Sequence, residues 1–246
     1  MTDRAVEISP QVYARIGGAL YLIIIVAGLF GEIFVRDTLI VSGDATATAN
    51  NIMASQLLWR VGIAGNLFHL ACAIALALIF YALLRPVSRD LALLAAFFEL
   101  VSISLEAAAK LPLLAALFPL GNAEYLKVFQ PEQLHALAYL SIKSHAYGFG
   151  ISLIFFGCAC LVLGYLIFRS GYLPKFLGIL MQIAGLSYLT NSFALVLAPA
   201  FADMISPAVL VPAFIGEMSL CLWLIVRGVN VASWNEQASA WRVRQA

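Results

Sequence analysis

Three ionisable side chains lie inside an apolar stretch that is long enough to cross a lipid bilayer. Residues 91–118 are almost entirely apolar, yet they contain Glu99, Glu106 and Lys110. At helical spacing these side chains fall on one stripe together with Ser102. Because a charged group in hydrocarbon is costly, we expect the stripe to face protein or a water-filled cavity. These residues are therefore the first candidates for a binding or catalytic site.

The depth of each charge in the membrane separates the costly groups from the tolerated one. Counted from the first residue of the stretch, Glu99 lies about 12 Å, Glu106 about 22 Å and Lys110 about 28 Å into a hydrocarbon core about 30 Å thick. Glu106 and Lys110 are four residues apart, with the glutamate first, which is the favourable order for an ion pair on one helix. An ion pair that only stabilises the bundle is an equally good interpretation. Glu99 has no partner on its own helix.

Polar residues at comparable depth occur in the other apolar stretches. His69 and Glu217 fall near the midplane, Asn66 lies one helical turn from His69, and Asn191 lies toward the outer side. If the helices turn these side chains inward, they would line one outward-facing cavity. The candidate ligand-binding residues are Glu106, Lys110, Glu217, His69, Glu99, Asn66 and Asn191.

Signatures of known catalytic sites are missing from the sequence. It contains no His-Glu-x-x-His, no Gly-x-Ser-x-Gly and no phosphate-binding loop. The cysteines lie in apolar stretches and show neither a disulfide pattern nor a zinc spacing. A dispersed metal site would require four residues from four helices to converge, namely His69, His145, Glu106 and Glu217. The sequence therefore assigns no metal, no cofactor and no reaction.

The composition is that of a polytopic membrane protein. Of the 246 residues, 63% are hydrophobic and 11% are charged, whereas a soluble domain is about half apolar and about a quarter charged. The net charge of +1 gives no indication of a nucleic-acid partner, and the lipid bilayer is the expected one. We expect one all-α domain over residues 1–246, a bundle of six transmembrane helices at about residues 16–35, 57–84, 91–118, 138–168, 176–197 and 207–226.

Basic residues are unequally divided between the two sides of this bundle. Short loops rich in Lys and Arg stay in the cytoplasm, so both termini are expected to be cytoplasmic. The side with more basic residues carries Arg4, Arg15, Arg85, Arg89, Arg169, Lys175, Arg227, Arg242 and Arg244. The other side carries Arg36, Arg60 and Lys127, while Lys110 and Lys143 lie near or within spans.

Three local patterns predict how the loops and helix ends are built. Asp44 is a good N-cap for a short helix after the first span, which would be either an ordinary surface helix or a lid over a cavity. The fourth span is too long for one crossing, so it either protrudes from the bilayer or breaks near Gly148 and Gly150. Four aromatic residues fall near predicted interfaces and are typical of a membrane aromatic belt, namely Trp59, Tyr172, Trp234 and Trp241.

Five segments carry a resemblance to a known family. They are RIGGALYLI (15–23), LIVSGDATATANNI (39–52), AYGFGISLIFFG (146–157), YLIFRSGYLP (165–174) and GEMSLCLWLIVRGVN (216–230). Together they resemble a bacterial membrane family known as domain of unknown function 4386. The resemblance implies a six-helix integral membrane protein, for which we expect the bacterial inner membrane. It implies no reaction, so no catalytic residue can be carried over.

The leading functional hypothesis is the binding or transport of a small or lipidic ligand through an outward-facing polar cavity. One alternative is a membrane-embedded hydrolase, with or without a metal ion. Another is a structural or sensory membrane subunit, which predicts a tightly packed interior. The sequence does not indicate an oligomeric state.

Overall fold

Helices provide all the regular secondary structure of residues 9–245, the part of the chain that the computed structural model describes. The side chains of residues 242, 244 and 245 are not included, and Arg4 lies outside the described residues. Six helical segments are long and apolar enough to cross a membrane, namely Pro10–Leu39, Gln56–Leu84, Arg89–Ala115, Pro131–Ser170, Lys175–Leu197 and Ala208–Val226. The predicted all-α architecture with six spans is confirmed.

The first and last spans are composite, and short helices connect several of the others. The first span comprises α1 (Pro10–Leu29), the π-helical segment η1 (Phe30–Arg36) and α2 (Asp37–Leu39). The remaining elements are α3 (Ala45–Ala54), α4 (Gln56–Leu84), α5 (Arg89–Ala115), η2 (Glu124–Val128), α6 (Pro131–Ser170), α7 (Lys175–Leu197), α8 (Pro199–Ile205), η3 (Ala208–Leu210), α9 (Val211–Val226) and α10 (Val231–Gln245).

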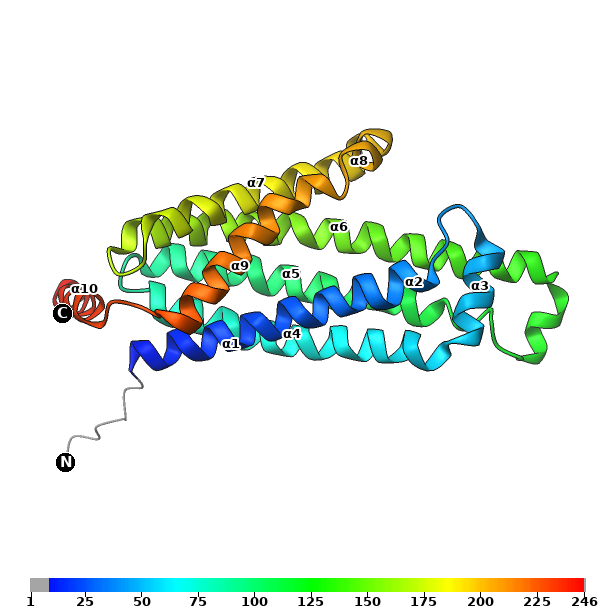
Figure 1. The fold of residues 1–246 in the computed structure, drawn as a ribbon, viewed down its shortest axis with the longest axis horizontal. Helices are drawn as coiled ribbons and strands as arrows, with labels where there is room; N and C mark the ends of the chain where they lie inside the picture. Colours follow the sequence, from blue (N-terminus) through cyan, green and yellow to red (C-terminus); the bar gives the residue numbers. More distant parts are fainter. Residues whose placement is uncertain (1–8, 246) are drawn as a thin grey trace, which may run out of the picture.

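The six spanning helices pack in a closed ring. In order around the ring, α1 packs against α4, α4 against α5, α5 against α6, α6 against α7, α7 against α9, and α9 against α1. The start of α1 and the helix α10 lie at one end of the bundle, here called the terminal end, and α3 lies at the opposite end, here called the α3 end (Figure 1). A closed ring gives every spanning helix one face toward a shared interior.

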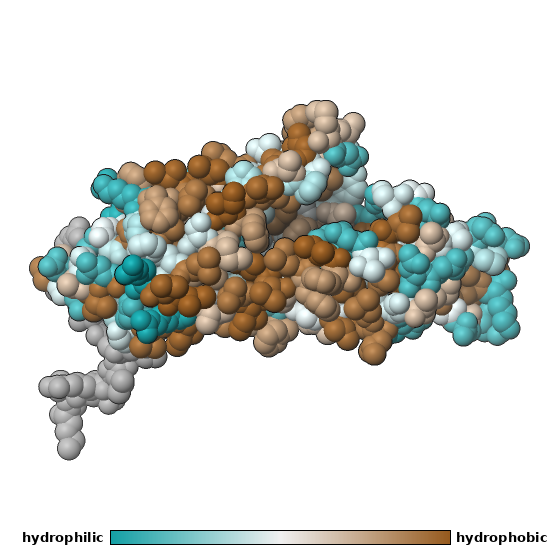
Figure 2. Space-filling view, in the orientation of Figure 1, coloured by the Kyte–Doolittle hydropathy of each residue, from teal (hydrophilic) through white to brown (hydrophobic). Residues whose placement is uncertain are grey.

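The outer surface of the ring is apolar over its middle. Phe68, Leu78 and Phe97 are among the large hydrophobic side chains that are more than half exposed. Figure 2 shows hydrophobic residues gathered along the middle of the bundle and hydrophilic residues concentrated toward its two ends. An apolar girdle between polar ends is the surface expected of a helical bundle in lipid.

The predicted short helix after the first span is present as α3. Asp44 caps it, with Oδ1 accepting a hydrogen bond of 2.8 Å from the Ala47 amide. The preceding loop is tied to α6, because the Gly43 amide donates to the Tyr139 hydroxyl at 2.8 Å. Helix α6 is unbroken over 40 residues, a length of about 60 Å. The long fourth span therefore extends past the bilayer rather than breaking at its glycines.

Glycines allow α6 and α7 to approach each other at two levels. A Cβ atom on Gly178 would lie 2.5 Å from the carbonyl oxygen of Gly164, and one on Gly185 would lie 2.7 Å from that of Gly157. Any larger residue would have to push the two backbones apart. Small residues that let two helix backbones approach closely are a common basis of helix packing in membranes.

Aromatic side chains donate hydrogen bonds to backbone carbonyls at the ends of two spanning helices. Trp59 Nε1 donates to the Leu113 carbonyl at 3.0 Å, near the end of α5. The Tyr172 hydroxyl and Trp234 Nε1 both donate to the Leu83 carbonyl at 2.7 and 2.9 Å, in the last turn of α4. The last carbonyls of a helix lack partners within it. Trp59 and Tyr172 are both buried, so the interpretation of these two as aromatic-belt residues is corrected.

Burial of Tyr172, in the turn between α6 and α7, predicts an alkaline loss of stability. Burial raises the pKa of this phenol above its ordinary value of 10.0. Above about pH 10 the unfolded chain loses a proton that the folded protein keeps, so the free energy of unfolding should fall by up to about 1.4 kcal/mol per pH unit. Chemical unfolding of wild type and Tyr172→Phe across this range checks the prediction. The free energy of unfolding of Tyr172→Phe should not show the fall that Tyr172 causes, and parallel pH profiles for the two proteins would contradict the prediction.

Candidate functional site

Three largely buried ionisable side chains form a contact group that links α4 and α5 near the α3 end. Lys110 Nζ lies 3.0 Å from Glu106 Oε1, and His69 Nε2 lies 3.3 Å from the same oxygen. The Lys110 side chain is only 2% exposed and that of Glu106 15%. We call His69, Glu106 and Lys110 the α3-end triad. The predicted pairing of Glu106 with Lys110 is present, and the tertiary fold adds His69 from the neighbouring helix.

Helix α6 contributes two side chains that lie next to the triad. Lys110 Nζ lies 5.3 Å from the centre of the Phe149 ring, a cation–π arrangement. His145, also on α6, donates from Nδ1 to the Ala109 carbonyl at 2.8 Å. Pro112, two residues after Lys110, has no amide proton and so cannot donate to the Ala108 carbonyl four residues earlier. The neighbouring Ala109 carbonyl accepts the His145 donor.

Asn66 packs beside the triad without joining it. Its Nδ2 donates to the Gly62 carbonyl of its own helix at 2.9 Å, and its amide group fills the space next to Gly31 of η1. Asn191 is half-buried on α7 and belongs to neither of the two groups of polar residues described in this subsection. For Asn66 the structure indicates helix packing.

A cavity of about 330 Å³ opens between the extension of α1 and the first half of α6. It contains two acidic side chains, Glu32 and Asp37, and two basic ones, Arg36 and Lys143. Glu32 and Arg36 form an ion pair within η1. The remaining lining residues are Ile40, Ser42, Tyr139, Ile142, His145, Ala146 and Phe149. We call this space the α3-end cavity. His145 and Phe149 contribute both to it and to the surroundings of the triad.

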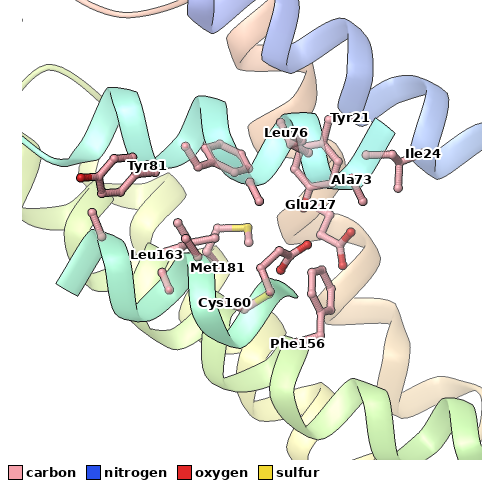
Figure 3. Close-up of a pocket in the computed structure, with 16 residues that line it drawn as sticks. Tyr21, Ile24, Ala73, Leu76, Tyr81, Phe156, Cys160, Leu163, Met181 and Glu217 are labelled. Carbon is pink, nitrogen blue, oxygen red and sulfur yellow. The ribbon is translucent and has the colours of Figure 1, made fainter. Parts of the chain in front are cut away.

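A second, smaller cavity of about 50 Å³ lies inside the ring of helices. Its 16 lining residues come from all six spanning helices, and Figure 3 shows their side chains meeting in this space. Its polar members are Glu99, Glu217, Tyr21, Tyr81 and Cys160, and apolar residues provide most of the wall. We call it the central cavity.

Glu217 is the better satisfied of the two acids in the central cavity. The Tyr188 hydroxyl donates to Glu217 Oε1, and the Tyr21 hydroxyl is a second hydrogen-bond partner. The Oε2 atom of Glu99 is buried and has no hydrogen-bond partner. Tyr21 and Tyr188 were not among the predicted site residues. Their position within apolar spans could have indicated them, because a buried tyrosine hydroxyl needs a hydrogen-bond partner.

The polar residues therefore form two groups, so the condition under which they would line one shared cavity is not met. Leu70, Ala73 and Ile103 form an apolar cluster between them. Ile103 lies on α5 between Glu99 and Glu106, and Leu70 directly follows His69 on α4. Glu106, Lys110 and His69 thus lie on one side of this cluster, and Glu99 and Glu217 lie on the other.

The proposed metal ligands are not brought together. Glu217 belongs to the central cavity, whereas His69 and Glu106 belong to the α3-end triad, and His145 is bonded to a backbone carbonyl. Within residues 9–245, no group of three or more His, Cys, Asp or Glu side chains has a geometry that could hold a metal ion. The arrangement offers ion pairing, hydrogen bonding and proton exchange as its chemistry.

Comparison with known proteins gives a family but no activity. Residues 16–228 match the model of the family described as "Domain of unknown function (DUF4386)". The chain belongs to this family. A curated relative of this DUF4386 member is an uncharacterised protein of Archaeoglobus fulgidus, 30% identical over 167 residues, which covers 68% of this chain and 83% of the relative. No solved structure matches. Family membership agrees with a multi-pass membrane protein and names no ligand or reaction.

Proposed function

We propose that this protein binds a small zwitterionic molecule in the α3-end cavity, and that this cavity faces the outside of a bacterial inner membrane. Five basic residues lie at or next to helix ends at the terminal end of the bundle, namely Arg85, Arg89, Arg169, Lys175 and Arg227. The positive-inside rule then supports cytoplasmic termini and an external α3 end.

The balance of charge around the cavity carries the proposal. Two carboxylates and two Lys or Arg side chains line the same space, so these four groups carry no net charge when all are ionised. A ligand with one positive and one negative group can pair with such a wall without leaving a buried charge uncompensated. The volume of about 330 Å³ lies at the lower end of the range of about 300–1,000 Å³ typical of small-molecule sites.

The backbone beside the cavity supports the same assignment. Phe30–Arg36 is π-helical, and this segment carries both Glu32 and Arg36 to the cavity wall. π-Helical turns cost stability and occur frequently at functional sites. Binding is proposed rather than transport, because the α3-end cavity and the central cavity have no lining residue in common.

Phosphoethanolamine is a suitable probe because it carries a phosphate and an ammonium group on a short chain. We expect it to raise the thermal stability of the full-length protein in detergent in a concentration-dependent way. Ethanolamine alone and inorganic phosphate alone should have much smaller effects, since each can pair with wall charges of one sign only. Equal shifts with all three compounds would contradict the zwitterion assignment.

Filling the cavity provides the matched test. Ala146 lies on the cavity wall and is exposed, so Ala146→Trp should fill the space without removing a charge and reduce phosphoethanolamine affinity at least tenfold. Ala108→Trp, on an exposed position of α5 away from the cavity, is the control and should bind as wild type does. Nanodiscs with and without phosphatidylethanolamine then distinguish a lipid headgroup from a free zwitterion. Unchanged binding by Ala146→Trp would place the ligand elsewhere.

A further inference from the structure

The central cavity contains two acids and no base. Glu99 projects from α5 and Glu217 from α9, and their carboxyl groups interact electrostatically. None of the 16 residues that line the cavity is Lys, Arg or His. Lys110, on the same helix as Glu99, is bonded to Glu106 on the other side of the apolar cluster. Neither acid therefore has a cation as a partner.

Two ionised carboxylates in this place would repel each other strongly. The interior of a membrane protein is a medium of low dielectric constant, where charges interact more strongly than in water and each unpaired ion loses its hydration. The tyrosine donors offset this cost at Glu217. They do not offset it at Glu99, whose buried Oε2 lacks a partner. A proton on the pair removes one charge and also provides a hydrogen-bond donor.

The size of the cavity suits water and protons rather than an organic ligand. A water molecule needs about 10–15 Å³ of cavity volume, so a cavity of about 50 Å³ holds only a few waters. Waters in this space would contact carboxyl oxygens and tyrosine hydroxyls and so have polar partners. The volume is far below the range of about 300–1,000 Å³ typical of small-molecule sites.

We propose that the central cavity is a proton-binding site, in which Glu99 and Glu217 together hold at least one exchangeable proton at neutral pH. The proton titrates as a property of the pair rather than of either residue. The other titratable groups that line the cavity or contact the pair are Tyr21 of α1, Tyr81 of α4, Cys160 of α6 and Tyr188 of α7, and Glu106 further along α5 acts electrostatically on Glu99. This site is independent of the ligand proposed for the α3-end cavity.

Infrared difference spectroscopy of the full-length protein in detergent tests this proposal. A protonated carboxyl group has a C=O stretching band that a carboxylate lacks. Wild type should show this band at neutral pH and lose it on alkaline titration. Glu99→Gln and Glu217→Gln should each remove or shift it, whereas Glu124→Gln, at an exposed glutamate outside both cavities, should leave it unchanged. A band that persists unaltered in both central variants, or is absent from wild type at neutral pH, would overturn the proposal.

Two further measurements keep the test decisive if a Gln variant does not fold. Tyr188→Phe keeps both acids and removes one donor to Glu217, so the band should shift in frequency and its loss should begin at a different pH. Replacing choline in the buffer by sodium, at constant pH and ionic strength, should leave the band unchanged. A loss of the band in sodium would mean that the pair binds Na⁺ instead, and the proton assignment would be wrong.

Discussion

Lys110→Met should lower the free energy of unfolding by about 3–5 kcal/mol, because removal of one partner from a buried ion pair leaves the other charge uncompensated. Lys110 Nζ lies 3.0 Å from Glu106 Oε1, and the lysine side chain is 2% exposed. After the substitution, His69 is the remaining partner in contact with Glu106. Denaturant-induced unfolding of the full-length protein in mixed micelles gives the measurement.

The double variant Glu106→Gln/Lys110→Met provides the second half of this test. It removes both charges, and exchange of a buried ion pair for uncharged residues of similar volume is often nearly neutral. The double variant should therefore be more stable than Lys110→Met alone. A double variant less stable than the single one would show that the triad contributes more than the cancellation of two charges.

A second Lys–Glu pair in this chain serves as a matched control. Lys127 and Glu124 are 2.8 Å apart, but their side chains are 71% and 84% exposed. Exposed pairs contribute about 0–1 kcal/mol, so Lys127→Met should have little effect. Equal losses in Lys127→Met and Lys110→Met would contradict the role assigned to burial.

Trp59→Ala is the second large effect, with an expected loss of about 3–5 kcal/mol for a large aromatic residue in a packed core. Trp59 is 1% exposed and lies in an apolar cluster with Val35, Leu113 and Ile142. This cluster joins the extension of α1 to α4, α5 and α6 at the α3 end. The substitution should therefore loosen the framework of the α3-end cavity as well as the bundle.

Trp59→Phe separates the hydrogen bond from the packing. It keeps most of the ring volume and removes the indole donor to the Leu113 carbonyl. A buried carbonyl without a donor costs about 1–3 kcal/mol, so this variant should lie between wild type and Trp59→Ala. If Trp59→Phe is as stable as wild type, the carbonyl does not depend on this donor. Thermal and denaturant unfolding of the three proteins in the same detergent provide the comparison.

The two cavities give the bundle two separate chemistries. The α3-end cavity is large, has two carboxylates and two Lys or Arg side chains, and lies beside a π-helical turn. The central cavity is small, has acids only and is enclosed by all six spanning helices. Because the two cavities have no lining residue in common, substitutions in one should leave the chemistry of the other intact.

Local and compositional information was enough to predict the architecture. The apolar runs set the number of spans, since backbone groups in lipid must be satisfied within a helix. The spacing of Glu106 and Lys110 predicted their ion pair, because residues four apart on a helix lie on the same face. Asp44 predicted the start of α3 for the same kind of reason: its side chain caps the amide of a residue three positions away.

Only the tertiary structure decided which helices share each polar site. His69 contacts Glu106 and Tyr188 contacts Glu217 across helix pairs whose rotation about their axes the sequence does not define. Burial of Trp59 against Leu113 likewise depends on how α4 meets the end of α5. Spans that are apolar on every side give little sequence signal for the inward face, because lipid and the protein interior are equally apolar. The sequence therefore determined the six spans and their buried charges, and helix packing determined that those charges occupy two sites rather than one.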